Sequence, residues 1–377
     1  MKAGIYIHIP FCKSRCSYCD FATDVYRNEA AVERYVNALI AEIANYELQS
    51  ANSVETIYFG GGTPSLLSAK QLEKILESIY KKFSIDEKIE FTLEMNPATV
   101  SLEKLQDFKS LGVNRASFGV QTFDDRALKI LARGHDSLDA RKTFILLRKA
   151  KFENVSFDLI GGLPNQSLKD WEKNLDEALN LNPEHLSLYL LEIHEGTPLA
   201  EQIRSQRQPL PDEDLAGEMY ELMVERVSKK GFEQYEISNF AKKGFESKHN
   251  NKYWLCEPVF GFGVSAHSFD GIGKRWSNER DTNNYVKLIE SGKSPIVETV
   301  NLTEKQLASE FAFLGLRLKK GLNLQEYKLK FNIDLKEKYA EDFHHFEKFG
   351  LIECDEEILR LTKKGYVYSN EVFTVFV

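Results

Sequence analysis

The sequence has little of what secreted, membrane-spanning and nucleic-acid-binding proteins need. It contains only five cysteines in 377 residues, an odd number that cannot pair completely in disulfides. Residues 1–10 have the pattern of a β-strand and not of a secretory leader, so we expect reduced cysteines and a cytoplasmic protein. No window approaches 18 consecutive apolar residues, so no membrane span is predicted. The net charge of −8 lacks the basic excess that phosphate contacts require, so no nucleic-acid partner is expected.

Repeats and low-complexity segments are also missing. With 42% hydrophobic and 28% charged residues, the composition is that of an ordinary soluble globular protein. A chain of this length has room for more than one domain. Changes in the alternation of strand and helix patterns predict a main domain over residues 1–205, a connecting region over 206–300 and a C-terminal domain over 301–377.

Strand and helix patterns alternate through the predicted main domain. Six short stretches are candidate strands, at 4–10, 55–61, 90–96, 115–121, 154–160 and 185–191. Amphipathic stretches lie between them, as at 71–83, 102–111 and 167–181. Six βα units in a row predict an α/β fold with a parallel sheet and helices outside, either doubly wound or a partial barrel. Periodicity does not choose between those two.

The predicted strands carry polar side chains at alternate positions, although parallel strands covered on both faces are usually apolar throughout. Tyr6 and His8 are examples in the first strand, while Glu94, Gln121 and Asp158 come near the ends of the third, fourth and fifth. If the apolar face packs on the helices, the polar row lines an interior at the strand ends, where the sites of βα barrels gather. These groups could instead bond only to one another in the core. Three such residues at three strand ends favour a ligand pocket.

Three of the cysteines form the strongest motif of the chain. Cys12, Cys16 and Cys19 follow the first strand with the spacing C-x3-C-x2-C, so one short loop can bring three thiolates to one metal centre. A structural zinc ion takes four ligands, usually from two C-x2-C pairs, and Cys256 and Cys354 lie far away along the chain. Three soft thiolates that leave one position open are typical of an iron–sulfur cluster. The loop therefore predicts a cluster with one open iron.

Two glycine-rich turns follow strands of the predicted sheet. Gly60-Gly-Gly-Thr-Pro comes after the second strand and removes side chains where a backbone approaches a ligand or takes positive φ. It is neither a G-x-G-x-x-G motif nor a P-loop. Together with the cysteine loop, it indicates a seat for a small polar ligand. Gly161-Gly-Leu-Pro, after the fifth strand, is either the same device or a plain turn.

The alternation of strands and helices stops at residues 196–215, where glycine, proline and acidic residues indicate a connection. Beyond it the patterns predict a helix over 215–229, a short strand within 231–241 and a tight, backbone-exposing loop over 261–269. The last part of the chain predicts helices at 304–318, 324–331 and 337–349, then a hairpin of 351–354 with 358–361. This order is that of a winged-helix-like module. Its acidic balance favours packing on the main domain over DNA binding.

Together these motifs resemble the radical S-adenosylmethionine (radical SAM) family of oxygen-independent coproporphyrinogen III oxidase and its relatives, over nearly the whole chain. The resemblance rests on the cysteine loop with Tyr18 before its last cysteine, on the glycine triplet, and on the spacing of Glu94, Gln121, Arg133 and Asp158. It implies a partial (β/α)6 barrel with a mostly helical C-terminal domain, in agreement with the strand count. It also implies a [4Fe–4S] cluster on the three cysteines, with SAM chelating the open iron.

The resemblance further implies which residues contact SAM. Glycine backbone can meet its amino group, Arg133 can pair with its carboxylate, and carboxylates suit the ribose hydroxyls or the sulfonium charge. The matching positions are Tyr6, Tyr18, Gly61, Gly62, Thr63, Glu94, Gln121, Arg133 and Asp158.

Two features separate the branches of this family. The oxidase branch usually has a longer segment before its first strand and a further cysteine two positions after the third, where this chain has Phe21. His249-Asn-Asn-Lys-Tyr-Trp matches instead the H-N-x-x-Y-W signature of the heme-chaperone branch. That similarity implies heme binding by the connecting region, and transfer to apo-haemoproteins such as those of the respiratory chain. It assigns no catalytic residue and carries the expectation of a homodimer.

The H-N-x-x-Y-W segment suits heme chemically. His249 offers an imidazole as axial iron ligand, Tyr253 is an alternative ligand, and Trp254 supplies a flat apolar surface. The same residues could form only a turn that packs on the core. Two other functions stay open: oxidative decarboxylation of coproporphyrinogen III through a 5′-deoxyadenosyl radical, and radical SAM chemistry on another substrate. Heme transfer is the first hypothesis.

Overall fold

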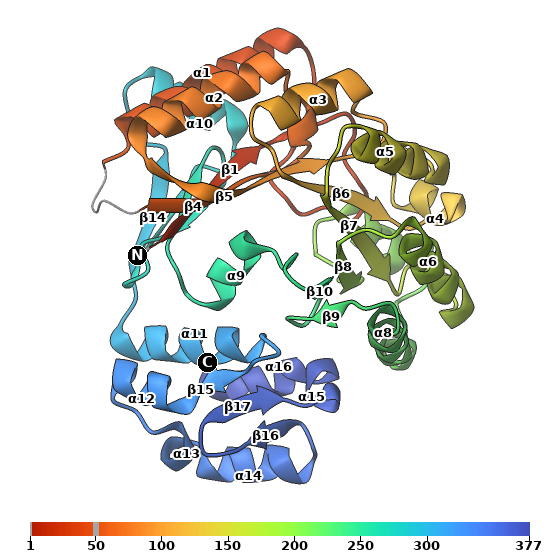
Figure 1. The fold of residues 1–377 in the computed structure, drawn as a ribbon, viewed down its shortest axis with the longest axis vertical. Coiled ribbons are helices and arrows are strands. Elements are labelled where there is room, and N and C mark those ends of the chain that lie inside the picture. Colours follow the sequence, from red (N-terminus) through yellow and green to blue (C-terminus); the bar gives the residue numbers. More distant parts are fainter. Residues whose placement is uncertain (1, 48–52) are drawn as a thin grey trace.

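The computed structural model describes residues 2–47 and 53–377. Its main feature is a curved, open sheet with helices on the convex side, and a smaller domain follows below it in Figure 1. One short helix, α9 (Lys248–Trp254), lies on the concave side instead. The concave side is therefore where polar strand faces and a helix meet.

Six parallel strands build the main part of the sheet, in the order in which they follow one another along the chain. They are β1 (Ala3–Ile9), β4 (Ser53–Gly61), β5 (Ser84–Met95), β6 (Arg115–Gln121), β7 (Asn154–Gly161) and β8 (His185–Leu190). The helices between them are α1 (Glu29–Asn45), α2 (Ala69–Lys82), α3 (Leu102–Ser110), α4 (Asp125–Ile130), α5 (Ser137–Lys149) and α6 (Leu168–Leu181). All six predicted strands are present, and the partial (β/α)6 barrel is confirmed.

The alternating pattern of the strands explains how the helices pack. The apolar rows turn outward, so that Ile7 of β1 is fully buried in one core with residues of the outer helices such as Leu39 of α1. Burying a side chain of this size contributes about 1.5–3 kcal/mol. Ser68 and Ser167 fix the starts of α2 and α6 through capping boxes. The polar rows are left to face the concave side.

The sheet continues beyond the barrel at both edges. Beside β1 it adds the parallel strand β11 (Val259–Phe262), then the antiparallel strands β12 (His267–Phe269), β13 (Lys274–Asn278) and β14 (Ile296–Asn301). Beside β8 it adds β10 (Asn239–Ala241) and β9 (Glu233–Gln234). The same region contains α8 (Glu213–Ser228) and α10 (Thr282–Glu290). It thus supplies both sheet edges, while its limits at residues 206 and 300 stay a prediction.

The prediction of a backbone-exposing loop over 261–269 was wrong at both of its ends. Gly261 and Phe262 belong to β11, and residues 267–269 form β12. The small residues allow close strand pairing, because a Cβ at Gly261 would lie 2.3 Å from the backbone oxygen of His267. Gly263 turns the chain between the two strands with a φ of 98°, which suits glycine.

The C-terminal domain combines helices with a small sheet. Its elements are α11 (Glu304–Leu316), β15 (Leu322–Asn323), α12 (Leu324–Phe331), α13 (Leu335–Lys338), α14 (Ala340–Lys348), β16 (Ile352–Cys354), β17 (Ile358–Leu361), α15 (Lys363–Val367) and α16 (Ser369–Phe373). The winged-helix-like prediction is confirmed. The predicted helix over 337–349 was wrong in its extent, because Tyr339 takes a non-helical conformation that separates α13 from α14.

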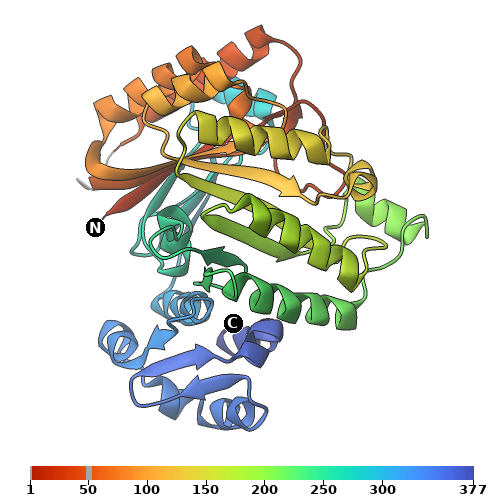
Figure 2. The same ribbon diagram turned by 45° about the vertical axis from the view of Figure 1, so that its right-hand side comes forward.

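The C-terminal domain packs against α9 and the sheet edge. The guanidinium of Arg317, just after α11, lies 4.3 Å from the ring centre of Trp254 in α9. It also pairs with the buried carboxylate of Glu236 at 3.3 Å. In Figure 2 this domain lies on the far side of the sheet from α1, α2 and α3. Arg317 therefore joins the C-terminal domain to the connecting region, through a cation–π contact with Trp254 and an ion pair with Glu236.

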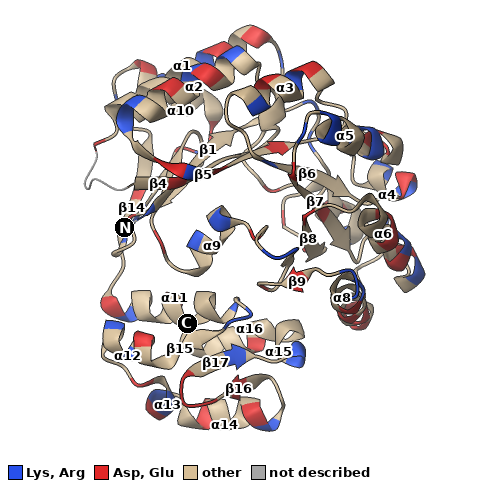
Figure 3. Cartoon of the chain, in the orientation of Figure 1, with Lys and Arg blue, Asp and Glu red and all other residues tan. Residues whose placement is uncertain are grey.

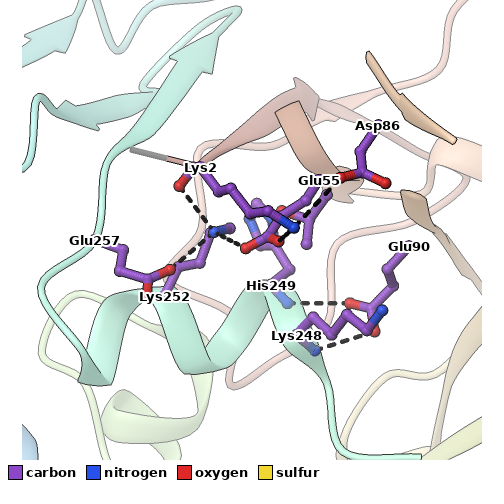
Figure 4. A network of polar contacts seen from close by, with 9 residues as sticks. Lys2, Glu55, Asp86, Glu90, Lys248, His249, Lys252 and Glu257 are labelled. Carbon is purple, nitrogen blue, oxygen red and sulfur yellow. Dashed lines mark hydrogen bonds and ion pairs between the residues drawn. The ribbon is translucent and has the colours of Figure 1, made fainter. Parts of the chain in front are cut away.

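Charged groups hold the start of α9 against the sheet, as Figure 4 shows. Ser247 caps the helix, and the carboxylate of Glu90 in β5 accepts hydrogen bonds from the N–H groups of Lys248 and His249, both at 3.0 Å. These donors have no partner within the helix, and a negative charge complements the helix dipole. The H-N-x-x-Y-W segment is thus a capped helix and not a turn.

A buried lysine holds the other end of α9. The side chain of Lys252 is 1% exposed, and its Nζ contacts Glu55 at 2.6 Å, Glu257 at 2.9 Å and the backbone oxygen of Lys2 at 3.1 Å (Figure 4). Burial raises the pKa of Glu55, but the hydrogen bond and charge of Lys252 outweigh it and lower this pKa overall. The three acceptors make it favourable to keep a charged lysine inside the protein.

No helix in the described part of the chain is long and apolar enough to cross a bilayer. Figure 3 shows acidic and basic residues interspersed along outer helices such as α1, α2 and α6. Neither sign forms a continuous face on these helices.

We expect Lys252→Ala to lower the free energy of unfolding by about 3 kcal/mol, because it leaves two partly buried carboxylates without their partner. Lys248→Ala is the matched control on the same helix, since its side chain is exposed and only its backbone N–H takes part in the anchor. Chemical denaturation of both variants measures the difference. Equal losses in the two variants would contradict the anchoring role of Lys252.

Candidate functional site

A cavity of about 450 Å³ opens at the carboxyl ends of the parallel strands, and we call it the strand-end cavity. Its wall combines the loop after β1 with the ends of β4 to β8. The three motif cysteines line it, together with Tyr18, Gly61, Gly62, Glu94, Gln121, Arg133 and Asp158. Seven of the nine predicted SAM contacts therefore meet in one cavity, and Tyr6 and Thr63 do not line it.

The cysteine loop is tied down along its length. At its base, β2 (Phe11–Cys12) pairs with β3 (Asp24–Val25). In its middle, the N–H of Ser17 donates to the carbonyl of Leu131 and its hydroxyl donates to the carbonyl of Ile130, both at 2.9 Å. These contacts restrict the backbone of the loop and so reduce the entropy that metal binding must overcome.

Burial disfavours the thiolate forms of Cys12 and Cys19. Burial raises the pKa of Cys12 to about 11 and raises that of Cys19, while a hydrogen bond from Thr63 at 3.6 Å partly offsets the effect on Cys12. The guanidinium of Arg133 lies 3.5 Å from the sulfur of Cys16. Because metal ligation requires thiolates, loading would release protons and place negative charge beside this arginine.

The geometry of the thiols argues against a single metal ion. Within residues 2–47 and 53–377, no three His, Cys, Asp or Glu side chains lie close enough together to hold one ion. In a four-iron cluster each thiolate binds its own iron, so the sulfur atoms stand farther apart than around one ion. Three free thiols that share a cavity therefore fit a cluster better than zinc.

The glycine turn after β4 lies directly against the cysteine loop. The N–H of Gly62 donates to the carbonyl of Ile9 at 2.8 Å, and a Cβ at Gly62 would lie 2.7 Å from the backbone of Pro10. Gly61 has a φ of 104°, and a Cβ there would lie 2.6 Å from the ring of His8. Both positions require glycine because side chains would separate the two loops.

Two half-buried carboxyl groups, Glu94 of β5 and Asp158 of β7, face the cavity. Burial raises the pKa of Glu94 to about 7, although Glu94 accepts hydrogen bonds from the hydroxyl of Tyr58 at 2.6 Å and the N–H of Gly61 at 3.2 Å. Burial also raises the pKa of Asp158, against the lowering effect of Arg115. A cationic ligand would favour the ionised forms and so bind with the loss of protons. The ammonium and sulfonium groups of SAM are cations of this kind.

Arg133 reaches the cavity from the turn after α4. Its Nη2 donates to Asn96 at 2.8 Å and to the carbonyl of Gly119 at 2.7 Å, and its Nη1 lies 3.4 Å from the hydroxyl of Tyr18. Its Nε is buried and has no hydrogen-bond partner among the described residues. An unpaired buried donor is costly, and a ligand carboxylate would satisfy it. This donor is the feature of the cavity that best fits an amino-acid ligand.

Gln121 and Asn96 show how the strand ends aim polar groups. The register of β6 shifts between Gly119 and Gln121, and Gln121 takes a φ of 65°. Such a bulge redirects a side chain at the end of a strand. Asn96 follows β5, where it accepts a hydrogen bond from Arg133 and donates to the hydroxyl of Thr63 at 2.8 Å.

The predicted SAM contacts do not include Tyr58, Asn96 and Arg115, which also line this cavity. Tyr58 and Asn96 occupy polar-row positions at strand ends, and that alternation was the signal that could have found them. Arg115 begins β6 fully buried, with an Nε that has no partner in the described chain. A lone arginine at the start of a strand gives no pattern to recognise.

Tyr6 and Thr63 lie behind the cavity wall and contact residues that form it. The ring of Tyr6 stacks on that of Tyr58 at 6.1 Å, and its hydroxyl lies 3.1 Å from Nδ1 of His8. Thr63 donates to the sulfur of Cys12. Their assignment as direct SAM contacts stays a prediction.

His249 lies inside the protein with both ring nitrogens engaged. Its side chain is 1% exposed, with Nδ1 2.8 Å from the hydroxyl of Thr56 and Nε2 3.2 Å from the hydroxyl of Tyr253. Burial lowers its pKa to about 3, so the imidazole is neutral. The assignment of His249 as an iron ligand stays a prediction, and it requires one of these contacts to break.

Comparison with known proteins identifies the family. Residues 6–178 match the Radical SAM superfamily, and residues 302–368 match the HemN C-terminal domain. The chain is 39% identical to the Heme chaperone HemW of Bacillus subtilis (strain 168), over 100% of this chain and 99% of that protein. The chain belongs to the HemW family. A second member, the Heme chaperone HemW of Lactococcus lactis, is 36% identical over 99% of this chain and 96% of its own.

A solved structure agrees with this fold. The coproporphyrinogen III oxidase HemN from Escherichia coli, described as a radical SAM enzyme, has a TM-score of 0.87 and 23% identity, and covers 100% of this chain and 90% of its own. Membership of the HemW family, within the radical SAM superfamily, implies a [4Fe–4S] cluster and SAM. The three free thiols and the unpaired donor of Arg133 fit these groups. The individual contacts stay predictions.

Alanine at Cys12, Cys16 or Cys19 should each abolish cluster assembly, because every thiolate would bind a separate iron. Iron and acid-labile sulfide counts after anaerobic reconstitution measure this directly. Cys256→Ala and Cys354→Ala are the matched controls and should keep the full counts. Loss of iron in either control, or its retention in a motif variant, would contradict the assignment.

Arg133→Ala should weaken SAM binding about tenfold to a hundredfold, the effect of losing a charge-assisted hydrogen bond. Equilibrium dialysis with reconstituted protein measures it, with iron counts to show that the cluster remains. Arg141→Ala, which removes a half-exposed arginine on α5, is the control. Equal SAM affinity in all three proteins would exclude Arg133 as the carboxylate partner.

Proposed function

We propose that this HemW-family chain is a heme chaperone, which binds heme and transfers it to apo-haemoproteins. The observation that carries the proposal is its full-length similarity to proteins named Heme chaperone HemW. The H-N-x-x-Y-W helix supports it chemically, because it presents Tyr253, 41% exposed, on a helix that is anchored at both ends. A phenol oxygen can bind ferric heme iron, and aromatic rings suit the macrocycle.

The cluster and SAM belong to the same proposal. Cys12, Cys16 and Cys19 would hold the cluster, Arg133 would hold the SAM carboxylate, and Glu94 would face its cationic groups. When bound together, these two groups supply one-electron chemistry. The chain itself provides thiolates for iron, an arginine that orients the ligand, and buried carboxyl groups that release protons as a cation arrives.

Oxidative decarboxylation of coproporphyrinogen III to protoporphyrinogen IX is the second candidate function. The likeness to Escherichia coli HemN favours it only at the level of the fold. Phe21, 66% exposed beside the motif cysteines, stands where the resemblance expects a further cysteine in the oxidase branch. We therefore prefer the chaperone, acting in the cytoplasm as a homodimer with respiratory-chain apo-haemoproteins as acceptors.

Anaerobically reconstituted full-length protein should take up ferric heme with a stable Soret band and should pass it to an apo-haemoprotein. The same preparation, given SAM, a reductant and coproporphyrinogen III, should leave the porphyrinogen unchanged. Absorption spectra follow the transfer, and chromatography of the porphyrins follows the reaction. Catalytic formation of protoporphyrinogen IX would show that the oxidase is the correct function.

A further inference from the structure

The helix α9 contributes to a second cavity besides the strand-end cavity. Asn250 lines the strand-end cavity, whereas Lys252 and Tyr253 line a cavity of about 300 Å³ at the other flank of the helix. We call it the ladder cavity, because its remaining wall is the ladder of β11 to β14. It is lined by Cys256, Glu257, Val259, His267, Ser268, Phe269, Arg275, Trp276, Ser277, Glu298 and Val300.

Strand register explains the chemistry of the ladder cavity. Phe269 lies opposite Arg275, and Arg275 lies opposite Val300, so these three share one face of the ladder. His267, Ser277 and Glu298 form the neighbouring row in the same way. Because paired residues point to the same side of a sheet, both rows face α9. This face therefore combines the apolar side chains of Phe269 and Val300 with four polar ones, among them the imidazole of His267.

The imidazole of His267 is free to bind a ligand. The residue is exposed, and its ring makes no hydrogen bond or ion pair with any described residue. His249 differs, since an iron bound to either of its nitrogens would displace Thr56 or Tyr253 and leave a buried group unpaired. The phenol of Tyr253 faces the same cavity as His267, from the opposite wall.

The two cationic side chains of the cavity wall, Lys252 and Arg275, are paired within the protein, whereas the carboxylate of Glu298 has no ion-pair partner among the described residues. Lys252 is bound by Glu55 and Glu257, and Arg275 donates to Glu310 at 2.9 Å. Most of the exposed wall is apolar and offers no free cation, so a ligand is apolar where the cavity encloses it and keeps its own anionic groups in water at the rim. Heme has this distribution, with a flat apolar macrocycle and two propionates on one edge.

We infer that heme binds in the ladder cavity with the imidazole of His267 as its axial iron ligand. The inference rests on the proposed function and names its site. Tyr253 contacts the heme from α9, and His249 is a positioning residue that holds the hydroxyl of Tyr253. The cavity takes only part of the macrocycle, which leaves an edge exposed for release to an acceptor.

The test is a titration of ferric heme into the full-length reconstituted protein and its variants. His267→Ala should weaken binding by about tenfold or more, the order of effect expected when groups at a metal are removed. It should also shift the Soret maximum of the heme that still binds. In His267→Gly, free imidazole should restore the wild-type spectrum, which a merely structural role of His267 would not allow.

Two tryptophan variants test the cavity independently of the ligand. Val300→Trp fills the cavity face of β14 and should block heme uptake, whereas Thr299→Trp, at the adjacent position on the other face of the same strand, should bind heme as the wild type does. His249→Ala should weaken binding without a Soret shift and without rescue by imidazole. Iron counts and circular dichroism show that each variant remains folded.

The outcomes separate the site from the function. Wild-type uptake with unchanged spectra and affinity in the His267 variants and in Val300→Trp would overturn the ladder cavity and leave the chaperone proposal standing. A Soret shift and imidazole rescue in the His249 variants, with neither in the His267 variants, would show that the iron ligand is His249 on α9 and not His267. If the wild type takes up no heme at all, the proposed function and the site fall together.

Discussion

The arrangement of the concave side depends on the buried lysine of α9. A helix of seven residues has no stability of its own in water, so tertiary contacts must hold it. Lys252 enters the protein with three acceptors, and Glu90 satisfies the N–H groups at the helix start. A buried charge that is fully paired is costly to break, which makes the position of the helix specific. Both cavities take residues from this one helix.

The charged groups of the strand-end cavity also lower the stability of the protein. Glu94, Asp158 and Arg133 are half-buried and Arg115 is buried, and the two arginines keep a buried Nε without a partner among the described residues. Such groups lower the stability of the empty protein. A ligand with a carboxylate and cationic groups would pair with them and add its binding free energy to folding. The polar strand faces are thus kept for binding and not for packing.

The six parallel strands and the cysteine motif could be predicted from the sequence, whereas the edge strands and the position of α9 could not. The six parallel strands were found because each has a period of two, and the cysteine loop because its spacing is specific to a metal centre. The edge strands β9 to β14 are short, and Gly261 masks one of them as a loop. No local pattern shows that α9 lies on the concave side of the sheet, since its anchors, Glu55 and Glu90, come from strands far away in the chain. The contacts of His249 depend on that placement, so its chemistry could be guessed only from the motif.

A single run of contacts connects the two cavities through His249. Glu94 accepts a hydrogen bond from Tyr58, the ring of Tyr58 stacks on that of His249 at 5.0 Å, and Nε2 of His249 lies 3.2 Å from the hydroxyl of Tyr253. A cation in the strand-end cavity would ionise Glu94 and strengthen its bond to Tyr58. Tyr253, whose ring is partly exposed, is the end of this run that lines the ladder cavity.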